Sequence, residues 1–478
     1  MNKYLVKISE DLKLHQNRAL AKLEHNDGVI LDHSMGSGKT MTFLKAIERD
    51  QKKNQNSNSI VIAPASLQTN VTNEIKKHGL KIDMSKVEVL SYEKATNDAA
   101  RLKKNKYTLA IADEAHRLRT TTTQRHKQLS EIIQNADKRI LATGTSSYNH
   151  ISDVAPLVNI AAGGFRVLPE TKKGFEEKYV SKKVESAPIL QRILGHPSKE
   201  VSSLKNKKEL KYHLDNYMDS YDNKSDPEAA KHFPTTSEKV IEVEMSPEQK
   251  TLYKYLEGKL PWHLRLKVRS GMPLDKKDSA QLNAFSSGIR QVSNSTKGFL
   301  PNYRETTPKI KKAADSIQED IASDKHFKGL IYSNYLDSGL HDYSEELTKR
   351  GITHGVYTGK LSKKEKDEMV DAYNKGKIKV LMVSSSGSEG LNLKGTKKVQ
   401  VMEPHFNKSK IDQVLARAAR YDSHKDLPAE ERHVEIEHYH SVFPKGLLGR
   451  RPTSIDTYLH DNSQHKDSLT MEMKKLTA

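Results

Sequence analysis

The chain has 478 residues, which is too long for one hydrophobic core and suits two or three domains. Its 80 Lys and Arg residues against 61 Asp and Glu residues give a formal net charge of +19. This balance favours a polyanionic partner, most simply nucleic acid, although it also serves solubility. The absence of cysteine excludes disulfides, thiolate zinc sites and a cysteine nucleophile, and it fits a reducing compartment.

Membrane and metal signals are weak in this sequence. The first 16 residues contain no sustained apolar segment, and no later run approaches the roughly 18 apolar residues that a membrane span needs. His438 and His440 fall on one face of a predicted strand, but no H-E-x-x-H motif or cysteine accompanies them. We therefore expect a soluble, intracellular protein with no membrane partner and no zinc.

A glycine-rich loop follows the first predicted strand. Residues 29–31 are an apolar run, residues 41–49 are compatible with a helix, and between them stands HSMGSGKT. This segment matches G-x-x-x-x-G-K-[ST] except that His33 occupies the first glycine position, and the strand–loop–helix setting is the one this motif requires. The residues predicted to bind the nucleotide here are Met35, Gly36, Ser37, Gly38, Lys39 and Thr40.

The residue types in this loop suit a triphosphate with its metal. Gly36 and Gly38 let backbone N–H groups turn toward the phosphates, and Lys39 adds a positive charge there. The hydroxyl of Thr40 can bind Mg²⁺. The loop alone predicts phosphate binding.

An acidic motif, Asp113-Glu114-Ala115-His116, follows a later predicted strand at residues 109–112. Strands of α/β sheets bind ligands at their carboxyl ends, where this strand delivers both carboxylates. We expect Asp113 to hold Mg²⁺, and Glu114 to orient and deprotonate an attacking water. The alternative is a glycine turn and an unrelated surface acidic cluster.

Strand-like runs alternate with helix-compatible segments in two parts of the chain, which predicts two parallel α/β lobes. Residues 172–312, between these parts, are helix-biased and lysine-rich, and they predict a basic insertion with a connector. The tail from residue 454 has helical spacing of apolar residues and should pack back on a lobe. The predicted strands are residues 29–31, 60–63, 87–90, 109–112 and 139–142, then 329–333, 380–384, 399–402 and 434–439.

Further motifs in the first part resemble superfamily 2 helicases, and within them the Swi/Snf-type branch. LHQNRALAKL, with Gln16, looks like the family's opening glutamine motif. Residues 60–77 look like the segment P-x-S-L-x-x-N-W-x-x-E, with Val71 replacing the tryptophan, and LSYEKA occupies the place of the next motif. LATGTSSYN resembles motif III, although Ser146 stands where proline is usual.

The second part continues this resemblance. GLIYSNY resembles motif IV and residues 384–395 resemble motif V, while QVLARAARYDSH has the family spacing Q-x-x-x-R-x-x-R. That spacing would put Arg417 and Arg420 on one helical face, where planar guanidinium groups can meet the charge that builds on a γ-phosphoryl group. An exposed basic helix is the alternative for these arginines.

The resemblance implies an α/β fold of two RecA-like lobes in tandem, with ATP and Mg²⁺ as cofactors. The implied domains are an ATP-binding lobe at 1–165, a helical, basic insertion and connector at 166–312, a helicase C-terminal lobe at 313–453 and a helical tail at 454–478. It also implies that Gln16 reads adenine and that Gly390 and Gln413 contact the nucleotide. The residues implied to relay nucleotide state to the bound strand are His116, Thr143, Gly144 and Thr145, whose hydroxyls could instead cap a helix or turn.

Contacts to the polymer should be mainly to its phosphates, because a motor cannot depend on base identity at each step. The candidates are Ser66, Thr143, Ser385 and Ser386 at strand ends, together with lysines. Trp262, the only tryptophan, stands among basic residues in the insertion and could wedge into or stack on a base. We favour a core anchor for a small helical unit as its role.

The segment RYDSHKDLPAEERHVEIEHYH resembles a narrower group, the helicase-like ATPases of large DNA viruses and phages, including the poxvirus-type early transcription factor and nucleoside triphosphatase. The Swi/Snf-type resemblance implies a motor that couples ATP hydrolysis to translocation on double-stranded DNA. The viral resemblance implies viral transcription or packaging proteins as partners, in the host cell cytoplasm or the virion. A strand-separating helicase on single-stranded DNA or RNA, and a transcription subunit whose nucleotide site switches binding, stay open. A restriction-motor subunit also stays open, without a nuclease carboxylate cluster in this chain.

Overall fold

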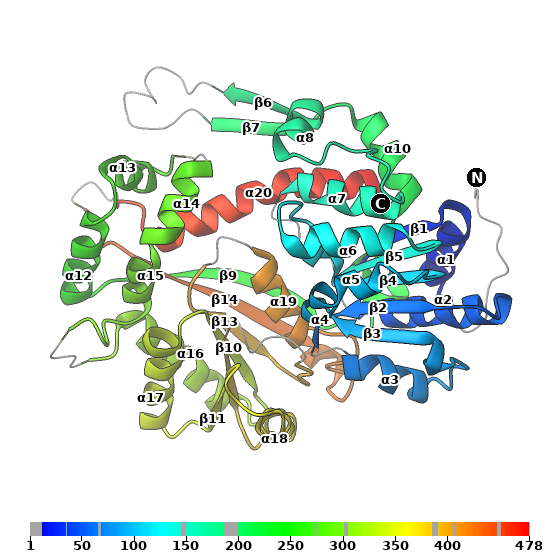
Figure 1. The fold of residues 1–478 in the computed structure, drawn as a ribbon. Coiled ribbons are helices and arrows are strands. Elements are labelled where there is room, and N and C mark those ends of the chain that lie inside the picture. Colours follow the sequence, from blue (N-terminus) through cyan, green and yellow to red (C-terminus); the bar gives the residue numbers. More distant parts are fainter. Residues whose placement is uncertain are drawn as a thin grey trace. The chain divides into compact units, whose positions relative to one another are not determined.

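The computed structural model describes residues 12–34, 36–65, 68–144, 150–185, 199–272, 274, 276–300, 305–384, 391–404, 408–446 and 451–477. Its elements follow the chain from blue to red in Figure 1. By internal contacts the chain divides into two units. The first comprises Met1–Lys183, Glu200–Pro227 and Lys466–Ala478, and the second comprises Val184–Lys199 and Glu228–His465.

The first unit is built on a parallel sheet. Among the described residues this sheet has six strands in the order β3-β2-β4-β5-β1-β8, and every pairing is parallel. The inner strands are buried on both faces, as continuous apolar runs in parallel sheets usually are. The strands are β1 (Gly28–His33), β2 (Ser59–Ala63), β3 (Val87–Ser91), β4 (Leu109–Asp113), β5 (Lys138–Gly144) and β8 (Met218–Tyr221).

Helices cover both faces of this sheet because alternate strand residues point to opposite sides. Val29 and Leu31 belong to a core with Phe43 and Ile47, whereas Ile30 belongs to the opposite core. The first core is closed by α1 (Leu14–Asn26), α2 (Lys39–Lys53) and α3 (Gln68–Lys77). The second takes side chains from α4 (Tyr92–Asn97), α5 (Ala99–Leu102), α6 (Gln124–Gln134), α7 (Val154–Ala161), α8 (Lys172–Tyr179), α10 (Lys207–Tyr217) and the end of α20 (Ile455–Thr477).

The second unit contains another parallel sheet. Its described strands follow the order β11-β12-β10-β13-β14-β9, again with parallel pairings throughout. The strands are β9 (Thr235–Glu244), β10 (Gly329–Ser333), β11 (His354–Tyr357), β12 (Val380–Ser384), β13 (Lys398–Val401) and β14 (His433–Val442). Its flanking helices are α16 (Pro308–Ser323), α17 (Asp342–Lys349), α18 (Lys363–Asn374) and α19 (Lys408–Ala418).

A group of helices with its own core belongs to this unit. Met245, Tyr253, Val268 and Phe443 pack there with the start of α20. The helices are α12 (Pro247–Gly258), α13 (Trp262–Ser270), α14 (Lys276–Phe285) and α15 (Ser287–Asn294), preceded by α11 (Pro227–Ala230). None of the helices in the described part of the chain has the length and apolar character to cross a bilayer.

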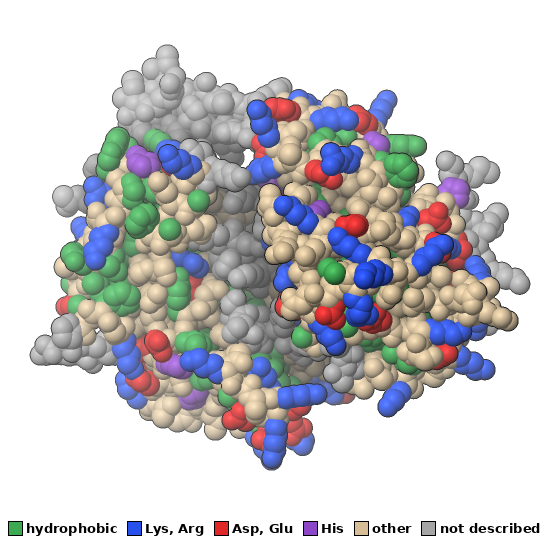
Figure 2. Space-filling model, in the orientation of Figure 1, with side chains coloured by type: hydrophobic (Ala, Val, Ile, Leu, Met, Phe, Trp, Pro, Cys, Tyr) green, Lys and Arg blue, Asp and Glu red, His purple; other side chains and the backbone are tan. Residues whose placement is uncertain are grey.

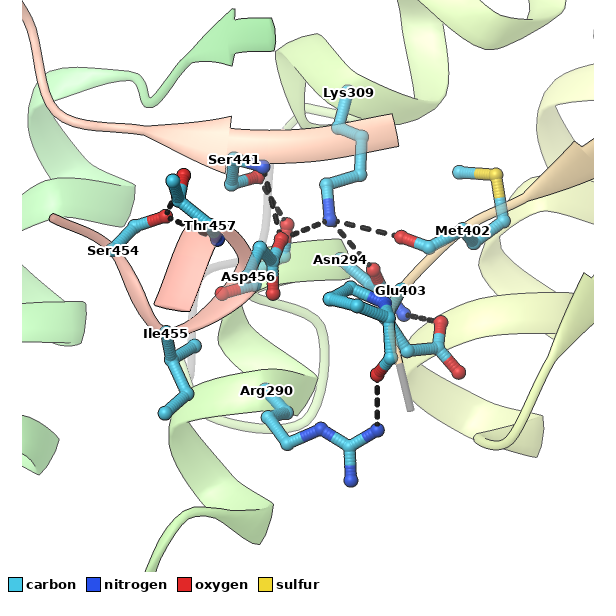
Figure 3. Close-up of polar contacts among 12 residues, drawn as sticks. Arg290, Asn294, Lys309, Met402, Glu403, Ser441, Ser454, Ile455, Asp456 and Thr457 are labelled. Carbon is cyan, nitrogen blue, oxygen red and sulfur yellow. Dashed lines mark hydrogen bonds and ion pairs between the residues drawn. The ribbon is translucent and has the colours of Figure 1, made fainter. Parts of the chain in front are cut away.

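A buried polar network lies at the carboxyl end of β13 (Figure 3). The Lys309 ammonium donates to Asp456 Oδ2 at 2.7 Å, to the Met402 carbonyl at 2.9 Å and to Asn294 Oδ1 at 3.1 Å. Asn294 donates in turn to Glu403 Oε2 at 2.6 Å, and Arg290 donates to the Pro404 carbonyl at 2.8 Å. The side chains of Lys309 and Asp456 are fully buried, so this network ties α15, α16 and the start of α20 to the end of β13.

The predicted fold class of two parallel α/β lobes is confirmed. The helix bias that we expected for residues 172–312 was only partly right, because this region also supplies strands β8 and β9 to the two sheets. It further contains β6 (Val180–Glu185) and β7 (Lys199–Leu204), which pair with each other. The alternation of β-branched and charged residues in β9 suits an edge strand. The division into four domains stays a prediction.

The tail forms the predicted helix, α20, and contributes to two cores. Ile455 and Leu459 pack in the helical core of the second unit, and Met473 packs in the first unit. The favoured role of Trp262 as a core anchor was wrong. Its side chain is 71% exposed, and Leu264 and Val268 are the buried anchors of α13.

Candidate nucleotide site

The carboxyl ends of three neighbouring strands bring the predicted catalytic segments together. β1 ends at His33, β5 ends at Gly144 and β4 ends at Asp113. His33 is in register with Gly144, and Asp113 with Ala142. The phosphate loop, the acidic motif and the start of motif III therefore meet at one edge of the first sheet, where α/β folds bind ligands.

The phosphate loop has the backbone that its glycines permit. Gly36 and Gly38 have φ angles of 78° and 84°, a region that other residues rarely adopt. A Cβ at Gly38 would come within 2.5 Å of Gln16 Nε2. Lys39 begins α2, and its ammonium donates to the carbonyls of His33 (2.9 Å) and Ser34 (3.3 Å). The positive charge thus lies inside the curve of the loop, at the amino end of a long helix, where a phosphate is stabilised.

Helix α1 holds the far end of this loop. Gln16 Nε2 donates to the Gly38 carbonyl at 3.1 Å, and Gln16 Oε1 accepts from the Lys13 amide at 2.9 Å. Burial lowers the pKa of His15 to about 4, so its ring is neutral and Nε2 can donate to the Ser37 carbonyl at 3.0 Å. Sequence reasoning missed His15. The adenine contact of Gln16 stays a prediction, because the structure shows this amide bonded to the loop.

The acidic pair combines a buried carboxyl group, Asp113, with a residue in a strained backbone conformation, Glu114. Burial, and then the charge of Glu114, raise the pKa of Asp113 to about 7, against the opposing effect of Lys39. Glu114 adopts a left-handed conformation with φ 54° and ψ 47°, which is rare for a residue with a side chain. Its carboxylate lies 3.3 Å from His116 Nδ1, and the Tyr92 hydroxyl donates to the Asp113 carbonyl.

These residues fit a divalent cation. A buried carboxylate beside a second carboxylate favours protonation until positive charge arrives, and oxygen ligands are those that Mg²⁺ prefers. Asp113 and the Thr40 hydroxyl are the groups that would hold it. Thr143 is also available for a ligand, because its buried Oγ1 has no hydrogen-bond partner in the described residues.

The arginine motif lies in the second unit and differs from our expectation in one respect. Gln413 is within α19 and Arg417 is in its last turn, but α19 ends at Ala418. Arg420 therefore does not share a helical face with Arg417. Its amide donates to Ser423 Oγ at 3.1 Å, and this hydroxyl donates back to the Arg420 carbonyl at 2.7 Å, so Arg420 belongs to a turn. The roles of Gln413, Arg417 and Arg420 toward the nucleotide stay predictions.

Several predicted residues lie outside the described part of the chain. They are Met35 and Gly390 of the nucleotide set, Thr145 of the coupling set, and Ser66, Ser385 and Ser386 of the polymer set. Gly144 and His116 lie within it, at the end of β5 and two residues after Glu114.

The largest omission of the sequence reasoning is strand β8. Asp219 on this strand is buried and accepts hydrogen bonds from His33 and Arg18. No motif marks Asp219, which is 186 positions from its partner. The one available signal was His33 itself, because a buried imidazole in place of the motif's glycine requires a polar partner.

Three family models match the chain, and two of them overlap at residues 81–147. The model of the SNF2-related domain matches residues 81–300, and that of the helicase conserved C-terminal domain matches residues 309–422. The model of the type III restriction enzyme, res subunit, matches residues 8–147.

Viral proteins are similar over nearly the whole chain. A protein of Acanthamoeba polyphaga mimivirus, provisionally named as an ATP-dependent RNA helicase, is 32% identical over 473 residues, which cover 96% of this chain and 94% of its own. A termination factor NPH-I homolog of African swine fever virus is 25% identical and covers 95% of this chain and 76% of its own. The solved Sulfolobus solfataricus SWI2/SNF2 ATPase core in complex with dsDNA aligns over 100% of this chain and 98% of its own, at 19% identity with a TM-score of 0.37.

The sequence relatives and the adjoining domain matches agree with the geometry of the first sheet edge, where a phosphate loop faces an Asp–Glu pair. The chain belongs to the SNF2-related branch of the superfamily 2 helicases, and it is a nucleic-acid-dependent ATP hydrolase with homologues in large DNA viruses.

Proposed function

We propose that this chain couples ATP hydrolysis to translocation on double-stranded DNA. The observation that carries the proposal is the connection between Glu114 and a basic pocket. His116 contacts Glu114 on one side and lines this pocket on the other. The net charge of +19 supports a polyanionic track, and the viral relatives support a role beside viral transcription or packaging proteins, in the host cytoplasm or the virion.

The basic pocket has a volume of about 820 Å³ and opens on the first unit beside α4 and α6. Three arginines, Arg117, Arg119 and Arg125, line it with the hydroxyls of Thr120 and Thr123. Only one carboxylate, Glu93, is among its lining residues in the described chain, and it pairs with Arg125 at 3.0 Å. Guanidinium and hydroxyl groups bind phosphates without reading bases, as a motor requires.

In hydrolysis we assign distinct tasks to the residues at the sheet edge. Lys39 and the loop amides would bind the β- and γ-phosphates, and Asp113 with Thr40 would hold Mg²⁺, which supplies positive charge to the phosphoryl oxygens. Glu114 would orient the attacking water and accept its proton. Arg417 and Arg420 would stabilise the negative charge that develops on the γ-phosphoryl group. Thr143 and His116 would relay the state of the nucleotide to the bound polymer.

One experiment tests the proposal directly. ATPase turnover of the full chain is measured with duplex DNA, single-stranded DNA and RNA, and displacement of a third strand from a DNA triplex reports stepping. We expect the largest stimulation with duplex and displacement that requires ATP. Glu114→Gln is the matched control, and it should abolish both while leaving DNA binding within twofold. No stimulation by duplex would overturn the proposal, and stimulation without displacement would identify a binding switch instead.

A second function, strand separation on single-stranded DNA or RNA, is favoured by the exposed face of α12 and α13. Hydrophobic side chains gather over these helices at the left of Figure 2. Trp262 is 71% exposed and Leu266, one turn later, is 55% exposed. On α12 the Tyr255 ring lies 4.6 Å from Lys259 Nζ. Exposed aromatic rings beside basic side chains are the groups on which unpaired bases stack.

The single tryptophan makes it easy to test the single-strand contact on which this second function depends. Binding of a dT oligonucleotide should quench the intrinsic fluorescence of Trp262, and Trp262→Ala should weaken oligonucleotide affinity about tenfold, within the range measured for base stacking. Tyr212→Ala is the matched control because Tyr212 is 65% exposed on the first unit. An unquenched tryptophan with unchanged affinity would remove Trp262 from the polymer contacts.

A further inference from the structure

The first residue of the phosphate loop is held by a strand from the insertion. His33 pairs in register with Tyr221 of β8, and its Nε2 lies 2.8 Å from Asp219 Oδ1. The His33 side chain is fully buried and Asp219 is 2% exposed. A glycine at this position of the motif needs neither space nor a partner, whereas the imidazole needs both, and β8 supplies the partner.

Asp219 is held as an anion at this place. Arg18 Nε donates to Asp219 Oδ2 at 2.6 Å, and Arg18 Nη2 donates to Oδ1 at 3.0 Å and to the Ser220 carbonyl at 2.7 Å. Burial by itself would raise the pKa of Asp219, but the hydrogen bonds from His33 and Arg18 outweigh burial and lower it. The carboxylate therefore accepts from the His33 Nε2–H, and removing it would leave a buried imidazole without that partner.

The next residues of the loop are held by the same segment. The Ser34 amide donates to the Tyr221 carbonyl at 2.8 Å, and Ser34 Oγ accepts from the Asn223 amide at 2.9 Å. The Tyr221 ring stacks on His15, with centroids 3.6 Å apart and planes at 8°. The segment from Asp219 to Asn223 therefore supports the beginning of the loop directly, at His33 and Ser34. It supports the end of the loop through the His15 ring, which bonds to the Ser37 carbonyl.

We infer that Asp219 and Tyr221 are positioning residues of the ATPase. They hold His33, Ser34 and His15 so that the loop amides keep the curvature a triphosphate requires. A shift of the β1 end by a fraction of an ångström would misalign several backbone donors at once, since hydrogen bonds weaken steeply with angle. The inference concerns nucleotide binding by the first unit and does not depend on which polymer the protein follows.

The test measures nucleotide affinity without nucleic acid. The Kd of the full chain for a fluorescent N-methylanthraniloyl ATP with Mg²⁺ is compared across a double-mutant cycle. We expect Asp219→Asn to raise this Kd about tenfold in the natural chain, equivalent to about 1.4 kcal/mol. In a His33→Gly background, which restores the motif's glycine, the same substitution should change the Kd less than about twofold. Steady-state ATPase should show the loss mainly in KM.

Controls separate positioning from folding. Glu472→Gln removes the partner of Lys207 elsewhere in the same unit and should leave the Kd within twofold. Thermal unfolding by circular dichroism is followed for every variant. If Asp219→Asn does not fold, Tyr221→Leu, at a half-buried ring, tests the same support through His15 and should raise the Kd about threefold. An unchanged Kd in the variant that folds, or an equal tenfold loss in both His33 backgrounds, would overturn the inference.

Discussion

The two units each contain a buried ionic network, one beside the phosphate loop and one at the end of β13, and these networks are built differently. In the first unit Asp219 joins His33 of the phosphate loop to Arg18, whose side chain is 45% exposed. In the second unit Lys309 and Asp456 have no exposed side-chain surface, and their network ends just before the segment that leads to α19 (Figure 3). One network reaches solvent at one member, and the other is closed.

The exposure of the members of each network determines whether its carboxylate acts mainly on folding or on the neighbouring loop. In a network without exposed members, water cannot replace a lost partner, so removing one charge is strongly destabilising and its main effect is on folding. When one member of a network is exposed, water can replace it and little stability is lost. The buried members, here Asp219 and His33, can then still position the neighbouring loop. Asp113 is a third case, because it is buried near Lys39 but remains electrostatically uncompensated.

Lys309→Met should have the largest effect on stability. It leaves Asp456 buried without its cation and removes donors to Asn294 and to the Met402 carbonyl. We expect the free energy of unfolding of the second unit to fall by roughly 3–5 kcal/mol, measured by urea titration. Lys311→Met is the control, since Lys311 forms an exposed pair with Glu305. Adding Asp456→Leu should restore much of the loss, and no restoration would mean that lost packing rather than unpaired charge is responsible.

The pH dependence of the metal requirement should show the uncompensated charge of Asp113. Because its pKa is raised to about 7, a growing fraction is protonated as the pH falls below 7, and only the ionised form binds Mg²⁺. The Mg²⁺ concentration for half-maximal ATPase should therefore rise about tenfold from pH 8 to pH 6.

ATP also takes up a proton in this range, so Asp113→Asn is the control for that measurement. Its Mg²⁺ requirement should be higher at every pH and should follow only the protonation of the nucleotide. If the Mg²⁺ requirement of the natural chain and that of this variant change with pH in the same way, protonation of Asp113 does not control Mg²⁺ binding.

Of the three predicted effects, that of Arg18→Ala on stability should be the smallest. Asp219 keeps its bond to His33, and the half-exposed guanidinium loses little when water replaces it, so we expect a loss of about 1 kcal/mol or less in thermal unfolding. The affinity for the ATP analogue should change less than with Asp219→Asn. Arg101→Ala, at an exposed pair with Glu88, is the matched control and should change neither quantity. A loss comparable to that of Lys309→Met would show that the first network is closed as well.

The parts of the fold that sequence predicts well are those with local signals. β10 and β12 have the bounds that we expected, because strands buried on both faces are continuous apolar runs. The sequence also predicted that Lys39 and Asp113 meet at one edge of the first sheet, because parallel strands align their carboxyl ends. The roles of these residues, and those of Arg417 and Arg420, stay predictions.

The parts that sequence did not predict depend on distant contacts. β9 is mostly exposed, so its polar residues gave no apolar run to detect. β8 has four residues, and Asp219 is recognised only when β1 lies beside it. The end of α19 before Arg420 follows from a turn closed by Ser423, a local preference that the motif spacing did not show.

The position of β8 in the chain has a consequence for how this protein could be adjusted. β8 ends at Tyr221, and the chain enters the second unit after Pro227. The short tether at residues 222–227 is therefore anchored at one end beside the phosphate loop and continues at the other into the second unit. We therefore expect a change in the length of this tether to alter nucleotide binding while every side chain of the phosphate loop stays the same.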